Sequence, residues 1–260
     1  MPAVLYEKKG HVAYITLNRP EARNAINSEA WEGLTKAWTD VRDDPEVRVA
    51  IVTGAGDKAF SSGADLKEIA QFMMMPEDKR PASPVPEITP MRGLEVWKPF
   101  IAAINGICTG GGLELAMACD MRIAAENATL GLMEVKQALM PSMTGTQRLP
   151  RLVPLCNALE ILLTGDFIDA NEAYRIGLIN KVVPVPELIT AAEELANRIA
   201  ENGPLAVKAI KELAYRGLEM KLADGIRLEQ EFTKVLGSSE DAREGPMAFA
   251  QKRKPEYKGR

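Results

Sequence analysis

The chain has 260 residues, of which 46% are hydrophobic and 26% are charged. A chain of this size can bury a substantial core, as one large domain or as one domain with an appendage. Its formal net charge is -4, from 32 basic and 36 acidic residues. This balance argues against nucleic acid or an anionic membrane as a general partner.

The histidine and cysteine content narrows the chemistry. The single histidine, His11, lies at the start of an expected strand, and we interpret it as a surface residue. Catalytic triads and metal sites that depend on histidine are therefore disfavoured, and we expect no metal. Cys108, Cys119 and Cys156 form no CxxC pair, so reduced, buried thiols are expected. Acid–base chemistry must then fall to carboxylates, lysine, tyrosine or the backbone.

The N-terminal residues MPAVLYEKKG lack a cationic region followed by an apolar run, so no signal peptide is expected. No apolar stretch approaches the roughly 20 residues of a membrane span. We therefore expect a cytoplasmic protein without a membrane partner.

The first half alternates between strand and helix patterns, which favours an α/β fold. The predicted elements, in chain order, are a strand at His11–Leu17, a helix at Ser28–Val41 with Ser28 as N-cap, buried strands at Val47–Thr53 and Phe100–Ile107, a helix at Leu113–Met121 and a strand at Met121–Ala124.

The second half predicts consecutive helices. They are expected at Pro186–Glu201, Pro204–Glu219, Leu222–Leu236 and Glu240–Phe249. We divide the chain into a β-rich core, residues 1–203, and a helical region, residues 204–260. The apolar faces of the late helices can pack on another subunit or on their own core, and the residues alone leave both open.

The segment Met73–Pro90 carries Pro76, Pro81, Pro84, Pro86 and Pro90. Proline at this density excludes regular helix and central strand. Long irregular insertions are lids, binding loops or disordered segments, and we favour a lid.

One glycine motif can be rejected. Gly54–Ala59 fits G-x-G-x-x-A, but a dinucleotide site needs a helix directly afterwards. Phe60–Gly63 follows instead and cannot form the first turns of a helix. No Gly-Lys-Ser/Thr ends the motif, which excludes a P-loop.

A second turn is more informative. Gly63 permits a tight turn, after which Ala64–Gln71 is predicted as a helix. This places free N–H groups near Ala64, at the positive end of the helix. An ordinary helix cap explains the same residues.

The segment Ile101–Asp120 is the most specific feature. Gly110, Gly111 and Gly112 between a strand and a helix let the backbone approach a ligand. The amides of Ala64 and Gly111 together can bind a carbonyl oxygen that becomes an oxyanion. Glu114 follows in the first helical turn, among apolar residues. Compensation of the helix dipole would explain an acid at this position, but it would not explain the apolar neighbours.

Glu134 is a second acid in an apolar context, within Leu130–Val135. A carboxylate in such surroundings costs free energy unless it is paired, protonated or used in chemistry. Two such glutamates, each beside a glycine-rich turn, indicate an acid–base dyad.

Four blocks carry a family resemblance: KAFSSGADLKE, GGGLELAMACD, MPSMTGTQRLPRLV and LLTGDFIDANEAYRIGLINKVVP. In order and spacing, across nearly the whole chain, they resemble the enoyl-CoA hydratase/isomerase (crotonase) family. The resemblance implies a spiral of ββα units with a C-terminal helical trimerisation region. It also implies a homotrimer or a homohexamer built as a dimer of trimers.

The resemblance assigns the oxyanion amides to Ala64 and Gly111 and the catalytic pair to Glu114 and Glu134. Members with both glutamates add water, so we expect reversible syn-hydration of a 2-enoyl-CoA to a 3-hydroxyacyl-CoA. Coenzyme A is then part of the substrate, and no separate cofactor is expected. The alternatives are a double-bond isomerase, a C–C lyase or hydrolase of this family, or an RNA-binding member.

Pro141–Gly145 is bulkier than the family's glycine-rich pattern. Met143 is expected to narrow the pocket, and the Ser142 amide to orient water. The residues expected to bind substrate or CoA, the last two from a neighbouring subunit, are Arg23, Ala59, Ser62, Ala64, Asp65, Leu66, Lys67, Gly110, Gly111, Met133, Pro141, Ser142, Phe249 and Lys252.

Overall fold

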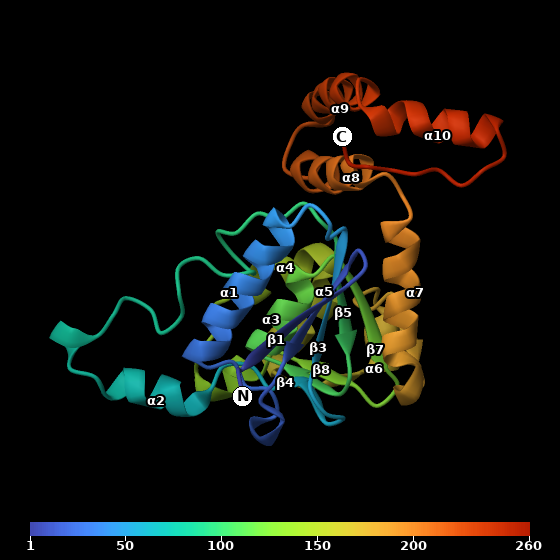
Figure 1. Ribbon diagram of the computed structural model, residues 1–260. Helices are drawn as coiled ribbons and strands as arrows, with labels where there is room; N and C mark the ends of the chain where they lie inside the picture. Colours follow the sequence, from blue (N-terminus) through green and yellow to red (C-terminus); the bar gives the residue numbers. More distant parts are fainter.

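The computed structural model describes Met1–Arg260 and contains two β-sheets with helices around them (Figure 1). The six-stranded sheet has the order β1 (Val4–Lys9), β2 (Val12–Leu17), β3 (Val49–Gly54), β5 (Phe100–Ile104), β7 (Met121–Ala125) and β10 (Lys181–Val183). The four-stranded sheet has the order β4 (Ala59–Ser61), β6 (Ile107–Thr109), β8 (Thr129–Gly131) and β9 (Ile168–Asp169).

The pairing of the larger sheet follows from its connections. β1 and β2 form an antiparallel hairpin, whereas the strands from β2 to β10 run parallel to one another. Every residue of β5 is buried, as expected for a strand covered on both faces. The apolar runs of the sequence therefore identify the central strands correctly.

One predicted strand is wrong in its extent. Phe100–Ile107 is not continuous, because β5 ends at Ile104 and β6 begins in the other sheet at Ile107. The Asn105 side chain bonds to the backbone of Gly54, and a Cβ on Gly106 would lie 2.4 Å from the Lys58 carbonyl oxygen. The chain thus crosses between the sheets at Asn105 and Gly106, and only glycine fits at position 106.

Helices cover both faces of the larger sheet (Figure 1). The remaining helices of the core are α1 (Ser28–Asp43), α2 (Leu66–Met74), α3 (Gly111–Ala118), α4 (Gly145–Leu152), α5 (Leu155–Thr164), α6 (Ala170–Arg175) and α7 (Leu188–Ala200), with 3-10 turns η1 (Pro20–Ala22), η2 (Glu77–Lys79), η3 (Met133–Gln137) and η4 (Val185–Glu187). Trp31, Leu34 and Trp38 of α1 join the main core, and α7 packs against the other face in a smaller apolar cluster.

Several local expectations need correction. The N-cap of α1 is Asn27, whose side chain accepts from the Ala30 amide at 3.0 Å, because the Ser28 hydroxyl donates to Glu68 instead. Ala64 precedes the helix α2, and Asp65 is the N-cap. Cys108 and Cys119 are buried as expected, but Cys156 is exposed.

The proline-rich segment is helical at its start, since α2 continues to Met74. The expectation of no regular helix therefore fails for Met73 and Met74. Beyond them the chain is irregular apart from η2, and it runs over the surface away from the sheets (Figure 1). Its role as a lid stays a prediction.

The last three helices, α8 (Pro204–Gly217), α9 (Leu222–Gly237) and α10 (Glu240–Ala250), lie together beyond the end of α7 (Figure 1). α9 buries none of its side chains within the chain. The final residues return to this group, because the Asp241 carboxylate accepts from the amides of Lys258 and Gly259. None of the helices is long and apolar enough to span a bilayer.

Candidate active site

Two backbone amides meet at the glycine turns. Gly63, at φ 89°, and Gly110, at φ 53°, occupy the left-handed region and turn the chain just before Ala64 and Gly111. A Cβ on Gly111 would lie only 3.6 Å from the Ala64 nitrogen, so the two amides are neighbours. Neither amide donates a hydrogen bond within the chain. Both are therefore available to one acceptor atom, as an oxyanion hole requires.

Glu114 is almost fully buried, at 2% exposure, in the first turn of α3. Its Oε1 accepts hydrogen bonds from the amides of Met143 at 2.8 Å and Gly145 at 2.7 Å. Burial and, to a smaller extent, the neighbouring Glu134 raise the pKa of Glu114 to about 7, although the two amides oppose the rise. A carboxyl group that titrates near neutral pH is suited to general base catalysis.

Glu134 lies in η3, beside the glycine turn at Gly110. A Cβ on Gly110 would be 3.1 Å from Glu134 Oε1, so a side chain at position 110 would press on this carboxyl group. Glu134 Oε2 is buried and has no hydrogen-bond partner within the chain. Burial raises the pKa of Glu134, which favours its protonated form. An unsatisfied buried oxygen of this kind is typical of a group that acts on a ligand.

A groove of about 1000 Å³ opens beside Ala64. Seven of the predicted binding residues line it: Arg23, Ser62, Ala64, Asp65, Leu66, Lys67 and Met133. The sequence analysis missed two residues that line the groove, Arg19 and Phe167. The Arg19 guanidinium pairs with the Asp65 carboxylate at 2.9 Å, and Phe167 lies in the loop before β9. Arg19 belongs to the same turn as Arg23, so the basic composition of that turn was the available signal.

Some predicted residues lie elsewhere. Ala59 is buried in β4, where its carbonyl accepts from the Asn24 side chain at 2.7 Å, and it does not line the groove. Phe249 and Lys252 lie at the end of α10, exposed, and also do not line it.

The Pro141–Gly145 turn differs in detail from its expected role. Pro141 is buried and has no N–H to donate, and Ser142 is exposed, with an amide that bonds to neither catalytic carboxyl group. The amides of Met143 and Gly145 do so instead, because the backbone of Thr144 adopts a left-handed conformation at φ 85°. Two amides that flank such a residue converge on one anion.

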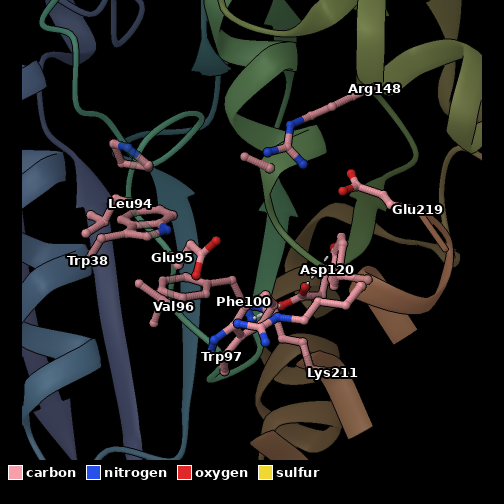
Figure 2. A pocket seen from close by; sticks show the side chains of 14 residues that line it. Trp38, Leu94, Glu95, Val96, Trp97, Phe100, Asp120, Arg148, Lys211 and Glu219 are labelled. Atoms are coloured by element: carbon pink, nitrogen blue, oxygen red, sulfur yellow. Dashed lines mark hydrogen bonds and ion pairs between the residues drawn. The ribbon is translucent and has the colours of Figure 1, made fainter. Parts of the chain in front are cut away.

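A smaller hollow of about 240 Å³ lies between α8 and the core (Figure 2). Three of its polar groups bond to one another, since Asp120 pairs with Lys211 at 2.8 Å and accepts from the Tyr215 hydroxyl at 3.0 Å. Burial and Asp120 raise the pKa of Tyr215, which keeps it a donor. These contacts fasten α8 to the core.

Comparisons with known proteins agree with this geometry. A family model described as enoyl-CoA hydratase/isomerase matches residues 7–260. An (E)-benzylidenesuccinyl-CoA hydratase of Thauera aromatica is 45% identical over 100% of both chains. A short-chain-enoyl-CoA hydratase of Clostridium acetobutylicum is 41% identical over 97% of this chain and 96% of that protein.

The crystal structure of an enoyl-CoA hydratase from Bacillus anthracis superposes with a TM-score of 0.93 at 42% identity, covering 99% of this chain and 100% of that one. The match confirms the expected α/β, crotonase-like fold with a C-terminal helical region.

Proposed function

The chain belongs to the enoyl-CoA hydratase/isomerase family, and from this premise we propose that it adds water reversibly to a 2-enoyl-CoA, giving a 3-hydroxyacyl-CoA. The observation that carries the proposal is a pair of glutamates, the buried Glu114 and the half-buried Glu134, beside two unpartnered amides. The two glutamates supply the acid and the base, and the two amides stabilise negative charge on the substrate's carbonyl oxygen.

The amides of Ala64 and Gly111 bind the thioester carbonyl oxygen. A C2=C3 bond conjugated to this carbonyl accepts a nucleophile at C3 once negative charge on the oxygen is stabilised. An oxyanion-hole donor lowers such a barrier by about 3 kcal/mol. The positive end of α3 adds to this effect at Gly111.

Glu114, as the carboxylate, takes a proton from water while the oxygen of that water bonds to C3. Glu134, protonated, donates a proton to C2. The proton on Glu114 then passes to Glu134 through solvent, which restores the starting state. The raised pKa values of both groups favour these roles, since Glu114 titrates at about pH 7 and burial favours the protonated form of Glu134. These steps use no metal or redox cofactor.

The groove accommodates the CoA portion of the substrate. Arg23 and Lys67 are exposed at its wall and form no ion pair within the chain, so both can meet phosphate groups. The charge reversal Arg23→Glu should raise KM more for the CoA thioester than for a pantetheine thioester without the nucleotide. Equal effects on both would remove Arg23 from the phosphate site.

A homotrimer or homohexamer is part of the proposal. Its support is the exposed apolar surface of the last helices, which includes Leu218 at 87%, Leu222 at 79% and Val235 at 72%. In such an assembly, Phe249 and Lys252 reach the CoA of a neighbouring subunit. The cytoplasmic location stays a prediction.

The direct test of the reaction is turnover of crotonyl-CoA in water enriched with ¹⁸O. Hydration places the label in the 3-hydroxyacyl product. A double-bond isomerase leaves its product unlabelled, and the presence of Glu114 argues against that alternative, because isomerisation needs only one shuttling base. The family's C–C bond-cleaving reactions give shorter products. An RNA-binding role is disfavoured by the net charge of -4.

A further inference from the structure

The carboxylate of Glu114 is held by a turn that needs its own support. Met143 and Gly145 donate to the same oxygen, Glu114 Oε1, at 2.8 Å and 2.7 Å. Between them Thr144 has φ 85° and ψ 2°, a left-handed conformation that is strained for a β-branched residue. If Thr144 relaxed, the two amides would diverge and Glu114 would lose both donors.

The support comes from Arg148, one turn into α4. Its Nε donates to Thr144 Oγ1 at 2.9 Å, and one terminal nitrogen donates to the carbonyl of Met91 at 3.1 Å. Met91 is fully buried and is fixed by the turn in which the Thr89 amide donates to the Arg92 carbonyl at 2.8 Å. Arg148 therefore ties Thr144 to the backbone of a buried residue outside the turn.

Arg148 forms no ion pair, although it lines the same hollow as other charged residues. It shares a hollow with Asp120 and Lys211, but Figure 2 shows it at the opposite end from that pair, and it forms no ion pair. Its guanidinium is thus committed to the Thr144 hydroxyl and the Met91 carbonyl. A lysine cannot reproduce this, because two separated acceptors require the planar fork of arginine.

We propose that Arg148 is a positioning residue that holds Thr144 left-handed and so keeps the Met143 and Gly145 amides on Glu114. This inference rests on the proposed role of Glu114 as the base. The charged groups that face Glu114 are Glu134 on η3, which raises its pKa, and Arg92, which lowers it. Neither of them is hydrogen-bonded to Arg148.

The test compares Arg148→Met with the matched control Arg151→Met. Arg151 is an exposed arginine on the same helix, and it bonds only to Gln147. The carboxyl titration of Glu114 is read by NMR on protein with ¹³C-labelled glutamate, and the signal is assigned by its loss in Glu114→Gln. Arg148→Met should raise the pKa of Glu114 by about one unit, as expected for weakened hydrogen bonds to a charged group.

Kinetics supply the second readout. In Arg148→Met, kcat should fall roughly 10-fold with KM little changed. The acidic limb of the pH profile of kcat should move to higher pH, together with the pKa of Glu114. Adding Thr144→Gly should restore both values, because glycine adopts a positive φ without support. Arg151→Met should change neither.

A folded Arg148→Met protein with an unchanged Glu114 pKa would overturn the inference. So would a loss of activity that Thr144→Gly does not relieve, since that indicates a general structural role. If Arg148→Met does not fold, the titration is read in Arg148→Lys, where a raised pKa supports the inference and an unchanged one overturns it. The titration needs no substrate, so it separates this inference from any failure of the hydration assay.

Discussion

At the scale of single residues, the sequence predicts the catalytic glutamates but not the hydrogen bonds that hold them. Glu114 and Glu134 stand out as acids among apolar neighbours, and the structure places Glu134 against Gly110 and Glu114 against Gly145, close enough for Glu134 to raise the pKa of Glu114. The donors to Glu114 were missed, because they depend on the left-handed backbone of Thr144 rather than on residue type. Nothing in the letters Pro-Ser-Met-Thr-Gly shows which amides converge.

The raised pKa of Glu114, about 7 against an ordinary 4.5, makes a prediction about stability. Between these values the folded protein binds a proton that the unfolded chain has lost, so the contribution of Glu114 to stability falls as pH rises through this window. Glu114→Gln does not titrate. Its melting temperature relative to the wild type should therefore increase between about pH 5 and pH 7.5.

Thermal unfolding of both proteins across that range measures the difference. The variant can retain the turn, because its amide oxygen can still accept from Met143 and Gly145. A difference in melting temperature that stays constant with pH would contradict the raised pKa.

At the scale of elements, the predicted strands and helices are mostly right where they depend on local pattern. Apolar runs gave β3 and β5, and helical spacing with proline starts gave α7 and α8. The break between β5 and β6 was missed, because a distant contact causes it. The Asn105 side chain bonds to Gly54 and Gly56, which lie about fifty residues earlier.

The variant Gly106→Ala tests this crossing. The added Cβ would lie 2.4 Å from the Lys58 carbonyl oxygen, and the alanine backbone would have to adopt φ 156°. We therefore expect the free energy of unfolding to fall by about 2–4 kcal/mol. Gly217→Ala is the control, since its Cβ meets nothing within 4 Å in a helix. Alanine there should be neutral or slightly stabilising.

Urea unfolding of both variants gives the comparison. A stability of Gly106→Ala equal to that of the wild type would show that the crossing tolerates a side chain and would contradict the steric account.

At the scale of the whole molecule, the C-terminal helices are least explained by the single chain. The sequence predicted them, but their partner is a tertiary or quaternary question that helical periodicity cannot answer. α9 buries no side chain, and Phe249 of α10 is 87% exposed. The division into residues 1–203 and 204–260 stays a prediction, because α8 is joined to the core through Lys211 and Asp120.

Phe249→Ala tests the shared site. In the proposed trimer this ring contacts a neighbour's CoA but does not hold the subunits together. Sedimentation should therefore be unchanged while KM for the CoA thioester rises several-fold, on the order of the 1–2 kcal/mol lost with a buried aromatic contact. A wild type that sediments as a monomer with full activity would contradict both the assembly and the shared site.

The central claim is that Glu114 and Glu134 together perform hydration. Its most direct measurement is kcat for crotonyl-CoA in Glu114→Gln and Glu134→Gln, beside an active wild type and with folding verified by circular dichroism. Each substitution keeps the side-chain volume but removes the proton transfer, so each should lower kcat by roughly 10²–10⁴-fold. Turnover near that of the wild type in either folded variant would contradict the account.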